Sequence, residues 1–436
     1  MDVSTRRRRD IVDALRRGAV PMNGLDVLAV GLDRFTRAVD EDLDRVTNGG
    51  SIFKAVRGEY GAGKTFFTRW LAERAKRRAF ATAEVQISET ETPLHRMETV
   101  YRRLVEQLST EQFAPSALRP ILDGWIFALE EDALADGEVA EEDADALDAA
   151  VGKLLEQRLA EISRSTPGFA AAVRGYRAAS AHGDNATADG LAAWLGGQPH
   201  VATAVRRFAG VKGDLDHFGA LSSLQGLLTM LRDSGHPGLL VVLDEVETLQ
   251  RVRSDARDKA LNALRQLIDE VYSGRFPGLY LVITGTPAFY DGQQGVQRLA
   301  PLAQRLATDF GTDSRWDNPR ATQIRLPGFT VDALVELGIK VTSLYSEAYD
   351  CPRAANVVDS AYVTELARAV TGRLGGQVGV APRIFLKKLV ADVLDRVELH
   401  ADWNPREHYQ ITLRTDELTD VERNAVTSAD DIDLPT

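Results

Sequence analysis

The chain has 436 residues, of which 44% are hydrophobic and 27% are charged, a composition typical of a globular protein and too apolar for a disordered one. Its formal net charge is −12, so attraction of the whole chain to nucleic acid is not expected, and any DNA contact needs a local basic face. The single cysteine, Cys351, excludes an internal disulfide framework or a metal site built on several cysteines, and it favours a reducing cytoplasm.

The N-terminal segment carries four consecutive arginines, Arg6–Arg9, with no apolar stretch after them, so it does not resemble a secretory signal. Nowhere does an apolar run reach the roughly 20 residues that span a bilayer, and we expect a cytoplasmic protein without membrane contact. Arg6–Arg9 are a candidate DNA contact, although a solvated end of the helix that continues through Ile11 and Leu15 is the simpler explanation. A second amphipathic helix is expected around 35–46, where apolar residues recur at helical spacing.

A strand and a glycine-rich loop come next. Residues 51–57 alternate apolar and polar side chains and predict a strand, and the apolar pattern from Phe66 to Ala75 predicts a helix. The sequence between them matches the phosphate-loop pattern GxxxxGK[ST]: Gly58, Glu59, Tyr60, Gly61, Ala62, Gly63, Lys64 and Thr65.

The residue types of this loop suit the binding of phosphate. Glycines let the backbone wrap phosphate groups with its N–H groups pointing inward, Lys64 neutralises β- and γ-phosphate oxygens, and Thr65 offers a hydroxyl to Mg²⁺. The helix that follows presents its positive N-terminus. A plain glycine turn explains neither the lysine nor the threonine, so the sequence predicts a binding site for ATP and Mg²⁺ formed by residues 58–66, with Phe66 as the last of them.

The stretch after the loop contains more residues than a compact phosphate-loop domain needs. A strand is predicted at 83–87 and a helix at 93–108, which carries Arg102 and Arg103 as a second basic candidate for DNA. Roughly 100 residues are surplus, and we assign them to an acidic, alanine-rich helical insertion at 111–214. Its charge suits docking of a basic partner, although a solvated helical spacer is the simpler interpretation.

The segment Leu239–Glu245 reads as a buried parallel strand that ends in two carboxylates. Two adjacent acids at a buried strand end are costly unless a cation satisfies them. We expect Asp244 to order the water shell of Mg²⁺ and Glu245 to polarise the attacking water, with Glu247 as the alternative base. Such a string alone is more often structural, and the phosphate loop elsewhere in the chain is what favours catalysis.

Strands alternating with helices, including one more strand at 279–284, predict an α/β fold with a parallel sheet covered by helices on both faces. The pattern after residue 329 is helical, and the tail contains one short strand-like piece, Tyr409–Leu413. The expected organisation is an N-terminal helical segment at 1–48, an ATPase core at 49–110 and 215–328, the insertion at 111–214, a helical lid at 329–397 and a tail at 398–436.

Three of these motifs together resemble AAA+ ATPases of the additional-strand class: the phosphate loop, the acidic strand end and the polar-tipped strand Leu279–Pro287. Four stretches are similar, more narrowly, to the BREX phage-defence ATP-binding proteins of the BrxC/BrxD family: Ile11–Gly18, Gly24–Gly31, Phe53–Phe67 and Gln86–Arg96. The resemblance covers most of the chain, whose length suits the short member of that family. It implies a homo-oligomer and, as partners, other phage-defence proteins such as helicase or methyltransferase components.

The AAA+ resemblance implies further site residues. Thr284 and Thr286 lie where a first sensor residue contacts the γ-phosphate or the attacking water, although hydroxyls satisfied at a strand end are an equal alternative. Arg383 is the candidate second sensor. A helix that begins near Pro382 would place this arginine at the positive end of the helix dipole, a conflict that a nearby anion would remove.

Three more arginines are weaker candidates from the same resemblance. Arg298 and Arg305 follow the sensor strand, where a finger reaching a neighbouring subunit would lie, although surface charge explains either one more simply. Arg34 falls where AAA+ proteins contact the adenine, but the residues around it depart from the usual pattern, which leaves its role open.

The leading hypothesis is therefore Mg²⁺-dependent ATP hydrolysis coupled to conformational or assembly work in a phage-defence complex. One alternative is a slow-hydrolysing ATP switch or scaffold that recruits protein partners. Another is a DNA-binding loader or translocase ATPase. Chemistry on a small-molecule substrate is not expected, because the seven histidines and the one cysteine show no nucleophile or zinc spacing.

Overall fold

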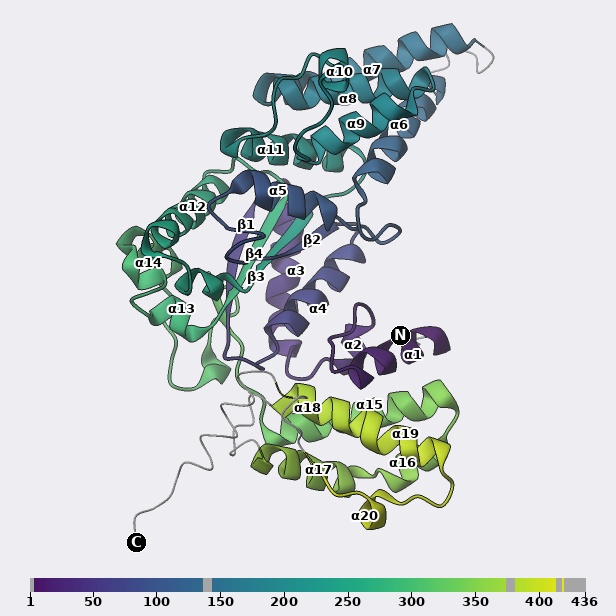
Figure 1. Ribbon diagram of the computed structural model, residues 1–436, viewed down its shortest axis with the longest axis vertical. Coiled ribbons are helices and arrows are strands. Elements are labelled where there is room, and N and C mark those ends of the chain that lie inside the picture. Colours follow the sequence, from purple (N-terminus) through teal and green to yellow (C-terminus); the bar gives the residue numbers. More distant parts are fainter. Residues whose placement is uncertain (1–3, 136–142, 374–380, 413–417, 419–436) are drawn as a thin grey trace. The chain divides into compact units, whose positions relative to one another are not determined.

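A computed structural model of the chain describes residues 4–135, 143–373, 381–412 and 418 (Figure 1). None of the helices within these ranges is both long and apolar enough to cross a membrane. The chain divides into two compact units. Unit 1 comprises Met1–Ala38, Val56–Glu73 and Asp309–Thr436, and unit 2 comprises Val39–Ala55 and Arg74–Thr308.

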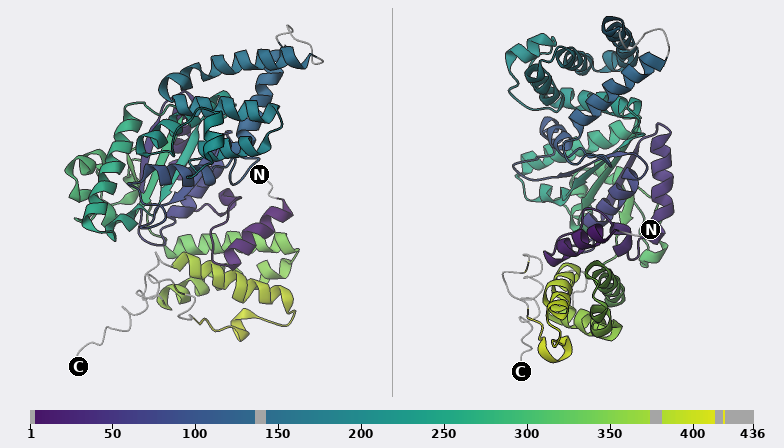
Figure 2. Two further views of the ribbon diagram at one scale, coloured as in Figure 1. Left: turned by 45° about the horizontal axis from the view of Figure 1, so that its top comes forward. Right: turned by 90° about the vertical axis from the view of Figure 1, so that its right-hand side faces the viewer.

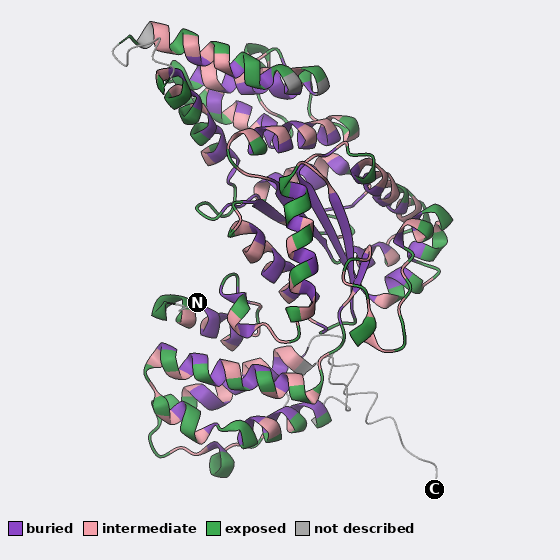
Figure 3. Ribbon diagram, turned by 180° about the vertical axis from the view of Figure 1, so that it is seen from behind, coloured by how far each residue is buried: buried purple, intermediate pink, exposed green. Residues whose placement is uncertain are grey.

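The central sheet has five strands in the order β2-β3-β4-β1-β5. Their bounds are β1 (Ile52–Arg57), β2 (Ala81–Gln86), β3 (Leu239–Asp244), β4 (Leu279–Gly285) and β5 (Gln323–Arg325). Strands β2 and β4 both pair in parallel with β3, with Ala81 and Leu279 opposite Leu239. Every residue of β1, β3 and β4 is buried (Figure 3), as expected for parallel strands without a solvated face. The predicted α/β fold with a parallel sheet is confirmed.

Unit 2 surrounds β2, β3 and β4 with helices. These are α5 (Met97–Glu106), α6 (Leu118–Ala135), α7 (Ala144–Ser165), α8 (Pro167–Ala181), α9 (Asn185–Leu195), α10 (Thr203–Phe208), α11 (His217–Asp233), η1 (Val246–Gln250), α12 (Ser254–Tyr272), α13 (Pro287–Asp291), η2 (Val296–Arg298) and α14 (Ala300–Leu306). Helices α6 to α9 pack against one another in chain order (Figure 2) and share one hydrophobic core with the sheet. The segment 111–214 therefore contributes apolar side chains to the core of unit 2.

Unit 1 is mostly helical and has its own hydrophobic core. Its elements are α1 (Thr5–Arg16), α2 (Leu25–Leu28), η3 (Ser314–Trp316), β5, α15 (Val331–Tyr349), α16 (Pro352–Val357), α17 (Ser360–Arg373), α18 (Ala381–Lys387), η5 (Lys388–Leu394), α19 (Asp395–Leu399) and α20 (Pro405–His408). Three elements have residues in both units: α3 (Asp33–Thr47), β1 and α4 (Lys64–Lys76).

Helix α1 packs on the C-terminal helices of unit 1 through its basic side chains. Arg8 forms an ion pair with Glu347 at 3.0 Å, and Arg9 donates a hydrogen bond to the carbonyl oxygen of Ala348 at 3.0 Å. Arg16 forms a bidentate contact with Asp395, at 2.7 and 2.8 Å. Two of the four arginines proposed for DNA contact thus hold α1 against α15.

A buried ion pair fastens β1 to α3 in unit 2. The ammonium of Lys54, which is 4% exposed, lies 3.4 Å from the carboxylate of Asp42, and the hydroxyl of Tyr280 donates to the same carboxylate at 3.0 Å. Burial lowers the pKa of Lys54 and raises the pKa of Asp42, because both charged forms lose hydration.

We expect Asp42→Ala to destabilise the protein by about 3–5 kcal/mol, because it removes the carboxylate from a buried ammonium. Tyr280→Phe removes one hydrogen bond to that carboxylate and is expected to cost about 1.5 kcal/mol. Urea unfolding of the two variants beside the unmodified chain measures both losses. Equal losses in the two variants would contradict the buried ion pair as the main contribution.

Candidate nucleotide site

The phosphate loop connects β1 to α4. Gly61 and Gly63 have φ angles of 80° and 87°, a left-handed conformation that glycine adopts without strain. Gly58 is constrained by space instead, since a Cβ there would lie 3.1 Å from the Cβ of Ala62. The N–H of Ala62 donates to the carbonyl oxygen of Glu59 at 3.1 Å, which closes the loop on itself. The backbone conformation at Gly61 and Gly63 and the close packing at Gly58 therefore explain why each of these positions is a glycine.

Lys64 begins α4 and reaches back over the loop that precedes it. Its side chain is 9% exposed, and Nζ donates to the carbonyl oxygens of Gly58 at 2.9 Å and Glu59 at 3.2 Å. Nζ also lies 5.1 Å from the centre of the Tyr60 ring. The positive N-terminus of α4 and the Lys64 ammonium therefore lie at the same end of one loop, as anion binding requires.

Apolar side chains of unit 1 lie beside the loop. A Cβ on Gly63 would lie 3.6 Å from the ring of Phe329, which precedes α15. Phe329, Phe66 and Val30 are half-buried and pack on the core of unit 1. The loop, the first turn of α4 and the start of the C-terminal helical segment thus share one apolar surface.

Arg34 makes contacts with the main chain of unit 1. Its guanidinium donates to the carbonyl oxygens of Ser314 at 2.8 Å and Arg325 at 3.0 Å, and it stacks 4.4 Å from the centre of the Phe35 ring. Burial lowers the pKa of Arg34. The observed role of this residue is to tie the start of α3 to the backbone around β5.

The end of β3 brings three predicted residues together in unit 2. Asp244 is buried, and its carboxylate accepts a hydrogen bond from the hydroxyl of Thr284 at the end of β4. The N–H of Glu245 donates to the hydroxyl oxygen of Thr284 and to Asp244 Oδ1, both at 3.1 Å. The Thr284 hydroxyl thus donates one hydrogen bond and accepts another at the ends of β3 and β4. This is the arrangement expected of a hydroxyl satisfied at a strand end, the alternative to a sensor residue.

Glu245 has a left-handed backbone, with φ 58° and ψ 41°, and an exposed side chain. A residue with a Cβ adopts this conformation at a cost on the order of 1–3 kcal/mol, and such strain is concentrated at functional sites. Glu247, the alternative base, lies within η1 and is 6% exposed. Of the two carboxylates, only that of Glu245 faces solvent.

Gln86 is a residue that sequence reasoning missed. It ends β2 opposite Asp244, and its side-chain amide donates to Glu245 Oε2 at 2.8 Å. The polar Gln86 near the end of the strand predicted at 83–87 could have indicated a site residue, because the carboxyl ends of parallel strands share one edge of a sheet. The pairing of β2 with β3, which brings the two residues together, was not evident from the sequence.

The remaining candidates have the following positions. Arg298 pairs with Asp258, Arg305 pairs with Asp269, and both pairs lie within unit 2.

Arg383 lies in the first turn of α18, where its guanidinium would be 3.4 Å from a Cβ on Gly18. Thr286 is buried at the start of α13, and Arg102 and Arg103 both lie within ion-pair distance of Glu106.

The two candidate magnesium residues supply the donor types that this ion prefers. Thr65 in unit 1 offers a hydroxyl, and Asp244 in unit 2 offers a carboxylate. Among the described residues, no group of three or more histidine, cysteine, aspartate or glutamate side chains is arranged to hold a metal. Each of the two oxygen donors is of a type that suits Mg²⁺, which binds through one or two protein oxygens, several waters and substrate phosphates rather than a protein cage.

Comparison with known proteins identifies the family. No curated protein matches the chain. The model of a family described as BREX system ATP-binding protein BrxC/D matches residues 3–413, which is nearly the whole chain. This match confirms the resemblance seen in the sequence, and the chain belongs to the BrxC/D family of BREX system ATP-binding proteins.

Proposed function

We propose that the chain binds ATP and hydrolyses it with Mg²⁺, and that hydrolysis supports conformational or assembly work in a BREX phage-defence complex. ATP binding follows from the family and from the phosphate loop. The observation that carries hydrolysis is the strained, exposed Glu245 held beside the buried Asp244 and Thr284. A carboxylate in this position is suited to accept a proton from water.

Each residue has one role in the proposal. Lys64 and the amides of residues 58–66 bind and orient the phosphates, and Thr65 and Asp244 hold the magnesium ion, directly or through its waters. Glu245 orients and deprotonates the attacking water, while Thr284 fixes the backbone of Glu245 and the carboxylate of Asp244. Bound Mg²⁺ supplies charge that neutralises the phosphate oxygens. Arg383 is proposed as the second sensor.

The strand order supports an AAA+ core of the additional-strand class, since β4 lies between the phosphate-loop strand β1 and the acidic strand β3. We assign the helices after Phe329 to the lid that this class carries. The position of Phe329 beside Gly63 supports that assignment, because it places the start of the helical segment at the phosphate loop.

The proposal is tested by steady-state phosphate release from ATP by the purified chain, with Mg²⁺ and with EDTA in its place. Release that requires Mg²⁺ supports the proposal. A chain that binds ATP but releases no phosphate with Mg²⁺ would contradict hydrolysis.

One observation favours the slow ATP switch as a second candidate. The Glu245 carboxylate accepts a hydrogen bond from Gln86, so the proposed base is partly occupied by its own chain. The DNA-loader alternative has no such support. Of the arginines proposed for DNA, Arg8, Arg9, Arg102 and Arg103 make protein contacts while Arg6 and Arg7 are exposed, and the chain has a formal net charge of −12.

If Gln86 restrains Glu245, Gln86→Ala should raise kcat for ATP several-fold, about what the roughly 1 kcal/mol of one hydrogen bond supplies. Gln198→Ala is a matched control, since Gln198 donates to Glu106 at 2.9 Å in the same unit. Phosphate release measures both variants. A lower kcat in Gln86→Ala alone would mean that Gln86 supports the base instead, and would remove this argument for a switch.

A further inference from the structure

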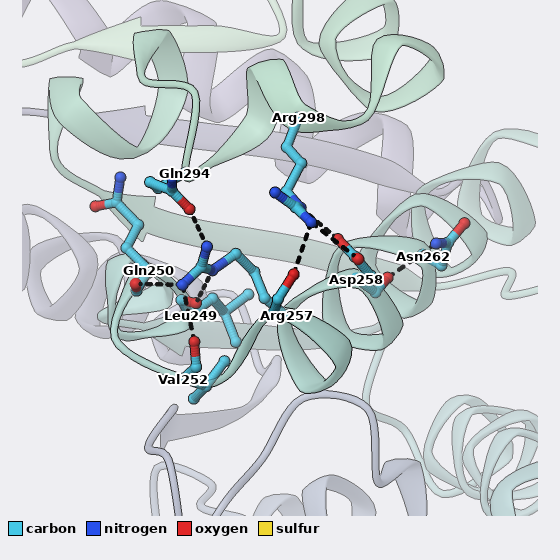
Figure 4. A network of polar contacts seen from close by, with 9 residues as sticks. Leu249, Gln250, Val252, Arg257, Asp258, Asn262, Gln294 and Arg298 are labelled. Carbon is cyan, nitrogen blue, oxygen red and sulfur yellow. Dashed lines mark hydrogen bonds and ion pairs between the residues drawn. The ribbon is translucent and has the colours of Figure 1, made fainter.

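Arg257 of α12 binds the turn at residues 249–252, which follows Glu245 in the chain (Figure 4). Its Nε donates to the carbonyl oxygen of Leu249 at 3.2 Å. One terminal nitrogen donates to the carbonyl oxygens of Gln250 at 2.9 Å and Val252 at 2.8 Å. The other donates to the side-chain oxygen of Gln294. A single guanidinium thus donates hydrogen bonds to three main-chain carbonyl oxygens within residues 249–252. We call these four residues the clamped turn.

These carbonyls need such a partner. They lie at and just beyond the C-terminal end of η1, where the last carbonyl oxygens of a helix have no partner within it and carry partial negative charge. A planar guanidinium with five fixed N–H donors can bind several carbonyls at once, whereas a lysine ammonium offers one compact charge.

Thr248 and Gln250 also contact the segments that follow the two strands neighbouring β3. The hydroxyl of Thr248, the residue before the clamped turn, lies 2.9 Å from the carbonyl oxygen of Glu245 and 3.2 Å from that of Ile87, directly after β2. The side-chain amide of Gln250 donates to the carbonyl oxygen of Ala288, just after β4, at 3.0 Å. The start of α12, which carries Arg257, is braced in turn by Arg298, which contacts Asp258 and Ser254.

We propose that Arg257 is a positioning residue for ATP hydrolysis, which holds the clamped turn so that Glu245 keeps its left-handed backbone. Strain of this kind persists only where the surrounding structure over-determines it, and Arg257 supplies three contacts to the clamped turn, which begins four residues after Glu245. Through Gln294, the same side chain connects the clamped turn to the segment that follows β4, the strand of Thr284. The inference rests on the proposed function, in which Glu245 is the base.

The test compares Arg257→Gln and Arg257→Lys with Arg265→Gln. Arg265 lies two turns further along α12, and its guanidinium pairs with Asp269 at 2.7 Å, away from the clamped turn. Arg257→Gln should lower kcat about 10- to 100-fold, the effect of a small misplacement of a catalytic group. The affinity for ATP should change by about twofold or less, because binding of substrate is untouched. Arg257→Lys should be intermediate.

Arg257→Gln that turns over ATP like Arg265→Gln would overturn the inference. Parallel losses of kcat, ATP affinity and folding stability would also overturn it, since they indicate a merely structural side chain. Amide hydrogen exchange of residues 245–253 tests the clamp separately, and exchange should be faster in Arg257→Gln than in Arg265→Gln. Equal exchange overturns the clamp even in an active enzyme, whereas absent turnover in the unmodified chain contradicts the proposed function itself.

Discussion

Lys64→Ala should weaken ATP binding by roughly 2–5 kcal/mol, the cost of removing one partner from a buried, hydrogen-bonded charge pair. This loss corresponds to an increase in Kd of roughly 30- to 4,000-fold. The ammonium lies over the loop at the N-terminus of α4, 2.9 Å from the carbonyl oxygen of Gly58. Isothermal titration calorimetry with ATP and Mg²⁺ measures the change directly.

Arg77→Ala is the matched control for this variant. Arg77 is an exposed cation one residue beyond the end of α4, so its removal changes the net charge equally without touching the loop. ATP affinity should remain near that of the unmodified chain. Equal affinities of Lys64→Ala and Arg77→Ala for ATP would contradict the assignment of the phosphate loop.

Glu245→Gln should bind ATP normally but lose about 10²- to 10⁴-fold in kcat, because an amide cannot accept a proton from the attacking water. The variant should therefore retain ATP rather than ADP after incubation with ATP and gel filtration. Chromatography of the nucleotide released from the denatured protein distinguishes the two.

Glu247→Gln identifies which carboxylate is the base. Glu247 lies two residues from Glu245 but is buried in η1, whereas Glu245 faces solvent. We expect Glu247→Gln to retain turnover. Loss of turnover in Glu247→Gln with normal turnover in Glu245→Gln would exchange the two roles.

The strands of the sheet were largely predictable from the sequence. The predictions at 51–57 and 239–245 differ by one residue at one end from β1 and β3. The burial of β3 is visible in its continuous apolar composition, whereas β1 was predicted from alternation and is nevertheless buried at every residue, Lys54 included. The three-residue β5 was missed because Gln323-Ile324-Arg325 has one apolar residue, and its place beside β1 comes from tertiary pairing.

The strand predicted at Tyr409–Leu413 was wrong for residues 409–412, which form no strand, while Leu413 lies outside the described residues. Tyr409 and Ile411 pack against the core of unit 1, and the hydroxyl of Tyr409 donates to Asp392 at 3.1 Å. The alternation here records burial on one side of the segment, since Tyr409 and Ile411 are half-buried and Gln410 and Thr412 are exposed. Pairing with another strand is a separate condition that a single sequence does not reveal.

The residues of the site also fall into those that the sequence predicted and those that it did not. The phosphate loop was recognisable because its chemistry is written in eight consecutive residues, and the acidic strand end because two carboxylates follow a buried strand. Gln86 contacts Glu245 across 159 residues of sequence, and Arg257 acts through main-chain carbonyls that no side-chain pattern marks. A contact between residues far apart in the sequence and a contact to main-chain carbonyls both depend on the folded chain.

The central claim, hydrolysis of ATP by Glu245, is tested most directly by phosphate release from saturating ATP and Mg²⁺, measured side by side for the unmodified chain and Glu245→Gln. Equal ATP affinity of the two proteins must be established first by calorimetry. We expect steady release by the unmodified chain and a rate at least about 100-fold lower for the variant. Equal rates in the two proteins would contradict the central claim.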